Sequence, residues 1–141
     1  MKSLTFKAEA HAKSGILNKW TSKSDNNELP IAIPESFKGP GQDLSPEDLY
    51  VQALINCLIG TFKVYAENSK LHFENINVIA DLKMDYDSSK AMIMKSCHFE
   101  IKLQTVSNPE KANLLIKKTF QNGFILNSVK TELTYNLNIH N

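Results

Sequence analysis

Two thiols are the side chains of this sequence best suited to covalent chemistry. Cys57 lies within SPEDLYVQALINCLIGTF, residues 45–62, and Cys97 lies within the apolar segment MIMKSCHFEIKL. A deprotonated cysteine is a nucleophile that attacks peroxides and disulfides. The two cysteines form neither a CxxC pair nor a disulfide framework, and the four histidines lack zinc-ligand spacing. The sequence therefore predicts two free thiols, with no metal site and no cofactor.

Composition excludes some classes of partner. The 141 residues carry a formal net charge of +1 and no basic run, which argues against nucleic acid as a partner. All sixteen basic residues are lysine. A mechanism that needs the planar, bidentate guanidinium of arginine is therefore excluded.

The segment around Cys57 predicts a long helix. Ser45 is suited to the N-cap, Pro46 to the first helical position, and Asp48 completes a pattern like a capping box. The helix is expected to run to about Asn68 and is apolar around most of its circumference. Such a helix is central or lies at an interface. Gly60, in its interior, is best explained by the close approach of another backbone.

No leader and no membrane segment is expected. The N-terminus lacks the apolar core of a signal peptide. The apolar stretch at residues 53–59 is interrupted by Asn56 and is far shorter than the ~20 residues that cross a bilayer. The expected compartment is the cytoplasm, where thiols are kept reduced.

The remaining segments predict a mixture of hairpins and helices. Strands are expected within residues 3–10, 16–24, 28–36, 75–87, 91–106 and 128–139, and a second helix from Asn108 to Gly123. The order βββ-α-ββ-α-β, without alternating βα units, predicts an α+β fold with mainly antiparallel sheets. Residues 1–141 are expected to form a single domain.

Local pattern alone does not assign a function to these residues. A lone cysteine in an apolar helix is most often part of the core. Cys57 is also about 18 Å from the helix start, beyond the reach of the helix dipole. Cys97 and His98 point to opposite faces of a strand and cannot form a catalytic pair. Glu47 suits a helix N-terminus, and Lys13 is an ordinary surface cation by its surroundings.

A family resemblance changes the weight given to Cys57. The stretch GPGQDLSPEDLYVQALINCLIGTF, together with the order of elements over nearly the whole chain, resembles the OsmC/Ohr family of osmotically induced and organic hydroperoxide resistance proteins. The resemblance implies an intertwined α+β homodimer. Its central helices would pack together, with the active sites at the subunit interface.

The resemblance also implies roles for individual residues. Cys57 falls on the peroxidatic cysteine, and Glu47 on a glutamate that normally holds an arginine. Lys13 takes the approximate place of that arginine. The resolving cysteine belongs to a segment that reads GFILNS here, so Gly123 stands where the thiol is expected and Asn127 retains an asparagine. Without arginine the usual Glu–Arg pair cannot form, and without the second thiol the usual two-cysteine cycle is expected to be broken or rerouted.

Three functions remain open. The first is a one-cysteine thiol peroxidase, in which Cys57 attacks a hydroperoxide and an external thiol such as coenzyme A resolves the product. The second is a dimeric, non-catalytic binding protein whose interface pocket holds an apolar or thiol-bearing ligand. The third is a structural remnant of the fold without chemistry.

Overall fold

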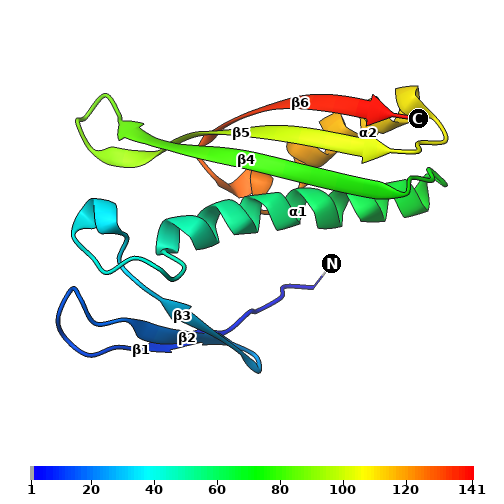
Figure 1. Ribbon diagram of the computed structural model, residues 1–141. Helices are drawn as coiled ribbons and strands as arrows, with labels where there is room; N and C mark the ends of the chain where they lie inside the picture. The colour runs from blue at the N-terminus through cyan, green and yellow to red at the C-terminus, as the bar shows by residue number, and fades with distance from the viewer. Residues whose placement is uncertain (1) are drawn as a thin grey trace. The chain divides into compact units, whose positions relative to one another are not determined.

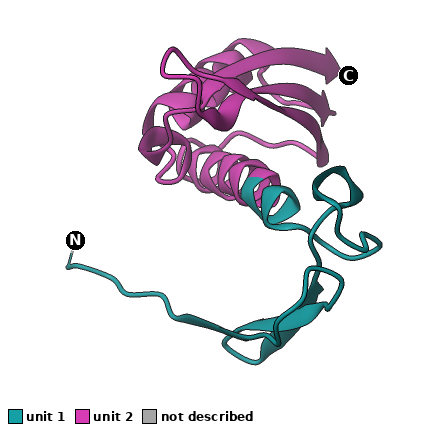
Figure 2. Cartoon of the chain, turned by 90° about the vertical axis from the view of Figure 1, so that its left-hand side faces the viewer, with its two compact units in different colours: residues 1–50 teal, residues 51–141 magenta. Residues whose placement is uncertain are grey.

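Two α-helices and six β-strands occur within residues 2–141, which the computed structural model describes. The chain divides into two compact units, the first extending to Tyr50 and the second spanning Val51–Asn141 (Figure 2). Each unit carries its own three-stranded sheet.

The first unit is built on an antiparallel sheet. Its strands are β1 (Ala8–His11), β2 (Trp20–Ser24) and β3 (Asn27–Ile31), with β2 in the centre (Figure 1). Trp20, the one tryptophan of the sequence, is half-buried and pairs with Ile31. A short 3-10 helix, η1 (Glu35–Phe37), follows β3. Leu44 then forms a bridge back to Ile31, and this contact positions the chain at the start of the long helix.

Helix α1 (Pro46–Asn68) begins where the sequence predicts. The Asp48 N–H donates to Ser45 Oγ at 3.0 Å, and the Ser45 N–H donates to Asp48 Oδ2 at 2.9 Å, which is a reciprocal capping box. The buried residues of α1 recur every fourth position, at Leu54, Leu58, Phe62 and Ala66. They form one stripe, so much of the remaining apolar surface is uncovered in this chain.

The length and composition of α1 would allow it to cross a membrane, a criterion that the core helix of a soluble protein also meets. Only 22% of its most apolar window is buried within the chain. Val64, for example, is 57% exposed. The helix therefore presents an apolar face that the second unit does not itself cover.

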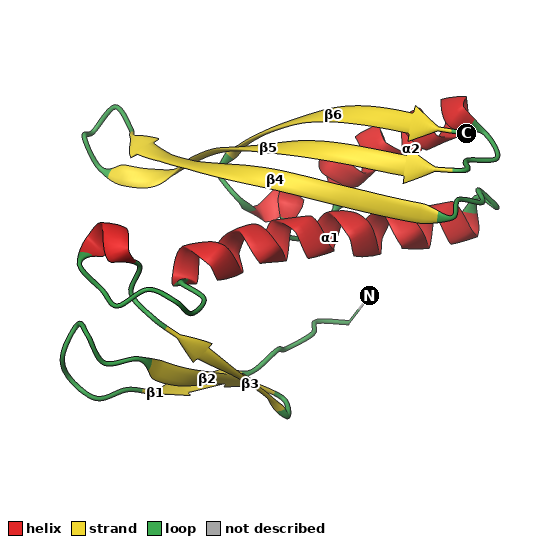
Figure 3. Ribbon diagram, viewed as in Figure 1, coloured by secondary structure: helices red, strands yellow, loops and turns green. Residues whose placement is uncertain are grey.

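The second sheet places one face against the helices. Strand β5 (Met92–Gln104) pairs antiparallel with β4 (Asn75–Tyr86) and parallel with β6 (Glu132–His140). Helices α1 and α2 (Pro109–Asn122) lie on the same face of this sheet (Figures 1 and 3). The side chains of β5 that point to that face are buried: Cys97, Phe99, Ile101 and Leu103.

Aromatic contacts fix α2 on the sheet. The Phe120 ring stacks on Tyr135 with centroids 4.5 Å apart and meets Phe99 edge-on at 5.2 Å. Asn108 caps the helix by accepting a hydrogen bond from the Lys111 N–H at 3.0 Å. A second short 3-10 helix, η2 (Leu126–Ser128), follows α2 and leads toward β6.

A tight turn joins β4 to β5. The Asp87 Oδ1 atom accepts hydrogen bonds from the Ser89 hydroxyl at 2.6 Å, the Ser89 N–H at 2.8 Å and the Ala91 N–H at 3.0 Å. These hydrogen bonds hold the pKa of the Asp87 carboxyl below its ordinary value. Lys90 adopts a left-handed conformation with φ of 65°, which closes the turn.

These observations confirm the predicted α+β class, the order of elements and the mainly antiparallel pairing. The first strand is shorter than expected, because pairing with β2 begins only at Ala8. The last strand begins at Glu132 rather than near residue 128, since residues 126–128 form η2. The single domain and the homodimer stay predictions.

Candidate functional site

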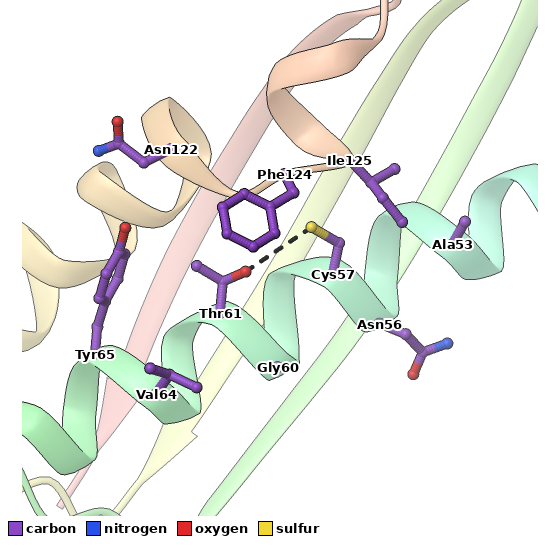
Figure 4. A pocket seen from close by; sticks show the side chains of 10 residues that line it. All are labelled: Ala53, Asn56, Cys57, Gly60, Thr61, Val64, Tyr65, Asn122, Phe124 and Ile125. Carbon is purple, nitrogen blue, oxygen red and sulfur yellow. Dashed lines mark hydrogen bonds between the residues drawn. The ribbon is translucent and has the colours of Figure 1, made fainter. Parts of the chain in front are cut away.

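Cys57 lies on the wall of an apolar cavity within the second unit. The thiol is partly buried on the fourth turn of α1, and the cavity has a volume of about 560 Å³ (Figure 4). The cavity is bounded by α1, by the end of α2 and by the segment that follows α2. The lining residues are Ala53, Asn56, Cys57, Gly60, Thr61, Val64, Tyr65, Asn122, Phe124 and Ile125. No lysine, histidine, aspartate or glutamate is among these lining residues.

Thr61 provides the polar contact of the Cys57 sulfur. Its Oγ1 atom lies 3.8 Å from Cys57 Sγ, one helical turn further along α1 (Figure 4). Residues four apart lie on the same face of a helix, so the spacing of Cys57 and Thr61 in the segment CLIGT brings their side chains together. The sequence analysis did not identify Thr61, although that spacing could have indicated it.

Gly123 and Cys57 are brought together by the packing of α2 beside α1. Gly123 ends α2, and its N–H donates to the Thr119 carbonyl at 2.8 Å. Its backbone is extended rather than left-handed, with φ of −57° and ψ of 132°. A Cβ atom at this position would lie 3.3 Å from Cys57 Sγ. Even a methyl group at this position would therefore crowd the thiol.

Gly60 lines the cavity, whereas Asn127 does not. The Asn127 N–H donates to the Gly123 carbonyl at 2.7 Å, so its backbone holds the segment after α2. Its side chain is exposed and does not line the cavity. Gly60 lines the cavity, and apart from the adjoining residues and backbone of α1 itself, no atom of the described chain lies within 4 Å of a Cβ built there. This chain itself therefore makes no close backbone approach at Gly60.

Cys97 differs from Cys57 in burial and in the cost of ionisation. It is fully buried on the inner face of β5. Burial, together with the nearby negative charge of Asp81, raises the pKa of the Cys97 thiol to about 11. His98 points to the opposite face, where its ring contacts Thr134 and Glu100. The expectation that Cys97 and His98 are not a catalytic pair is confirmed.

Glu47 and Lys13 belong to the first unit. Glu47 lies in the first turn of α1, and its Oε1 atom is buried without a hydrogen-bond partner among the described residues. Lys13 is exposed between β1 and β2. Within residues 2–141, the ion pairs made by lysine are Lys19–Asp43 and Lys83–Asp85, so Lys13 does not pair with Glu47 in this chain. Roles for Glu47 and Lys13 beside the thiol stay predictions.

This arrangement is suited to covalent chemistry on an apolar molecule. The sulfur is open to a cavity large enough for a small organic ligand. No group of three or more His, Cys, Asp or Glu side chains within residues 2–141 is arranged to hold a metal ion. The chemistry that this chain itself offers at the cavity is therefore that of a thiol with a neighbouring hydroxyl.

Comparisons with solved structures show the same fold. An OsmC-like protein of unknown function from Vibrio cholerae superposes with a TM-score of 0.85 at 17% identity, over 96% of this chain and 100% of that one. An organic hydroperoxide resistance protein from Legionella pneumophila gives 0.71 at 17% identity, over 100% of both chains. An organic hydroperoxide resistance protein from Elizabethkingia anophelis gives 0.75 at 20% identity, over 100% of this chain and 99% of that one.

The sequence comparison agrees with the fold. A search of curated proteins gave no match. The family model described as OsmC-like protein matches residues 39–138, which include α1, both long strands, α2 and most of β6. The resemblance seen in residues 39–62 thus extends over more than two thirds of the sequence. The chain belongs to the OsmC-like protein family.

Proposed function

We propose that this protein is a homodimeric, cytoplasmic thiol peroxidase that reduces organic hydroperoxides through Cys57 alone and uses an external thiol for turnover. The observation that carries the proposal is the Cys57 sulfur on the wall of the 560 Å³ apolar cavity. The names of the structural neighbours from Legionella and Elizabethkingia support the choice of substrate class.

The first step is attack of the Cys57 thiolate on the terminal oxygen of the hydroperoxide. The S–O bond forms as the O–O bond breaks, so sulfur is oxidised by two electrons and the peroxide is reduced to an alkoxide. The alkoxide takes a proton from water and leaves as the alcohol. Cys57 then carries a sulfenic acid.

The second step needs a thiol from outside the chain. Gly123 lies against the Cys57 sulfur but has no sulfur of its own. Cys97 is buried, and its thiol pKa of about 11 disfavours the thiolate at neutral pH. A small thiol such as coenzyme A therefore condenses with the sulfenic acid, which releases water and gives a mixed disulfide. A second small thiol reduces that disulfide and restores Cys57.

A second copy of the chain completes the proposed site. The uncovered apolar face of α1 supports burial against another α1, and Gly60 lies on the open side of that helix. The neutral lining of the cavity and the unpartnered Glu47 Oε1 support the idea that charged groups reach the thiol across a subunit interface. Glu47 and Lys13 of the partner are the groups proposed to adjust its charge.

Intact-mass spectrometry after one equivalent of cumene hydroperoxide tests the proposal. The expected product without added thiol gains one oxygen at Cys57, and with coenzyme A it becomes the mixed disulfide. Both products should be absent in Cys57→Ser and retained in Cys97→Ala. Multiple-turnover consumption of cumene hydroperoxide should require both Cys57 and the small thiol.

Two results would overturn the peroxidase proposal. A disulfide between Cys57 and Cys97 would show that the resolving thiol lies within the chain. An unmodified Cys57 after exposure to the hydroperoxide would show that the site does not react. The second result would favour a binding protein, because no charged side chain among the described residues lines the cavity. Calorimetric titration with coenzyme A and with a neutral apolar ligand would then identify the class of ligand.

A further inference from the structure

The Cys57 sulfur has one hydrogen-bonding neighbour within the described chain, the Thr61 hydroxyl. We infer that Thr61 is a positioning residue that holds the Cys57 thiolate by donating its hydroxyl proton to the sulfur, in the absence of any arginine. The inference rests on the proposed reactivity of Cys57. It concerns a residue that the family resemblance does not assign.

The first argument is the orientation of the hydroxyl. A helical threonine can donate its hydroxyl to the carbonyl four residues earlier, and Thr119 does so in α2, with 2.8 Å from Oγ1 to the Leu115 oxygen. The recorded partner of Thr61 Oγ1 is instead the Cys57 sulfur at 3.8 Å. Figure 4 shows the hydroxyl of Thr61 directed toward the sulfur beside Phe124.

The second argument is that the two amide side chains of the cavity are engaged elsewhere. Asn56 Nδ2 donates to the Gln52 carbonyl at 2.8 Å and to its side-chain oxygen at 3.1 Å. Asn122 Nδ2 donates to the Lys118 carbonyl at 3.2 Å. Thr61 is thus the lining residue whose side chain forms a hydrogen bond with the thiol.

Besides Cys57, Tyr65 is the titratable residue that lines the cavity within the described chain, and Lys118 contacts its ring. The Tyr65 ring lies under the Lys118 ammonium, 4.5 Å from its centroid. Tyr65 lines the cavity two turns after Cys57, whereas Lys118 does not line it. In the proposed dimer, Glu47 and Lys13 of the second copy are further charged groups. The test must therefore separate the effect of the Thr61 hydroxyl from the effects of these four titratable groups.

The third argument concerns the direction of the hydrogen bond. While Cys57 is protonated, either the thiol or the hydroxyl can donate. A thiolate has no proton, so only the Thr61 hydroxyl can donate, and bonds to an ionised partner are the stronger ones. The contact therefore favours the thiolate over the thiol. It also fixes the sulfur toward the cavity, because Thr61 lies on the same face of α1.

The test measures the rate of iodoacetamide alkylation at Cys57 as a function of pH, with the site read by peptide mass. Thr61→Val removes the hydroxyl and keeps the branched shape. Its alkylation profile is expected to shift to higher pH by about half a unit to one unit, which corresponds to the loss of one ordinary hydrogen bond. Thr61→Ser keeps the hydroxyl and should restore the wild-type midpoint.

Thr119→Val serves as the matched control, because it removes a helical hydroxyl that bonds a carbonyl rather than sulfur. Its profile should match that of the wild type. Thr61→Ala repeats the test if Thr61→Val does not fold, and sedimentation checks that every variant has the wild-type assembly. A Thr61→Val midpoint equal to that of the wild type overturns the inference. An equal shift in Thr61→Ser does so as well, because it would assign the effect to packing.

Alkylation uses no peroxide, so this result is independent of the proposed activity. If Cys57 fails to reduce hydroperoxides but its alkylation midpoint moves with the Thr61 hydroxyl, the peroxidase proposal fails and the positioning role stands. If turnover is observed and the midpoint does not move, the positioning role fails alone.

Discussion

At the scale of single residues, the two thiols of the sequence lie in different environments. Cys57 faces a cavity and contacts a hydroxyl, whereas Cys97 is fully buried beneath the helices. The Cys57 thiol can be approached by a small molecule, and the Cys97 thiol cannot be without local opening of the fold. Cys57 is therefore expected to react faster than Cys97 because of its position, although both residues are cysteines.

Native alkylation should therefore modify one cysteine. At pH 8, iodoacetamide is expected to label Cys57 in the folded protein and to label Cys97 only after denaturation. Peptide mass spectrometry with and without urea measures both sites. Labelling of Cys97 in the folded protein at a rate comparable to that of Cys57 would contradict the burial seen here.

The Cys97 thiol also links stability to alkaline pH. Its pKa is raised on folding, so the protonated form is favoured in the native state, and the associated stability is present below about pH 8.5. That stability is lost as the pH rises toward about 11. Urea denaturation between these limits should show a steeper fall in the free energy of unfolding for wild type than for Cys97→Ala.

At the scale of elements, local signals in the sequence located the helices well. The cap at Ser45 and Asp48 fixes the start of α1, and Asn108 followed by Pro109 fixes the start of α2. These signals act within a few residues, so they can be read without knowledge of the fold. The start of β1 is different, because alternation from residue 3 gives no information on where a partner strand begins.

Long-range pairing set the remaining features. The parallel pairing of β5 with β6 joins segments separated by all of α2, and no local pattern in β6 specifies its direction. The candidate site also depends on long-range packing. Cys57 was a candidate from its helix and the family resemblance, but its proximity to Gly123 depends on the packing of α2. Thr61 lies four residues from Cys57 and was within reach of a local argument.

The turn between β4 and β5 should respond to acid. The pKa of Asp87 is lowered by hydrogen bonds from Ser89 and Ala91. A lowered pKa gives stability above the ordinary value of about 3.9, and this stability is lost as the pH falls through the folded-state pKa. Asp87→Asn is expected to lower the melting temperature at pH 6 and to reduce its fall between pH 5 and pH 3.

Ser88→Ala is the control, because the hydrogen bonds of the Asp87 carboxylate come from Ser89 and Ala91 instead. Thermal unfolding followed by circular dichroism measures both variants. Equal acid dependence in Asp87→Asn and wild type would show that this carboxylate does not stabilise the turn.

At the scale of the whole molecule, the uncovered face of α1 should couple stability to assembly. If a second copy covers this face, as proposed, only the folded dimer gains the burial and the melting temperature rises with protein concentration. Val64→Lys places a charge on α1 at a side chain that is 57% exposed in the single chain. It should shift the protein to monomers in analytical ultracentrifugation and abolish the concentration dependence.

Leu114→Lys gives the matched comparison, since Leu114 is a 65% exposed residue of α2. It is expected to leave the sedimentation coefficient unchanged. If Val64→Lys sediments like the wild type at micromolar concentration, α1 does not provide the subunit interface. The proposal that partner residues reach Cys57 would then lose its basis.

The placement of Trp20 gives the molecule a natural optical label. It is the one tryptophan in the sequence, and it lies on the central strand of the first unit, paired with Ile31. The second unit contributes tyrosines but no tryptophan. Tryptophan emission therefore comes from the N-terminal sheet, while helical ellipticity is dominated by α1 and α2. The two signals can be recorded on the unmodified protein, and their coincidence or separation reveals whether both parts of the chain melt as one cooperative body.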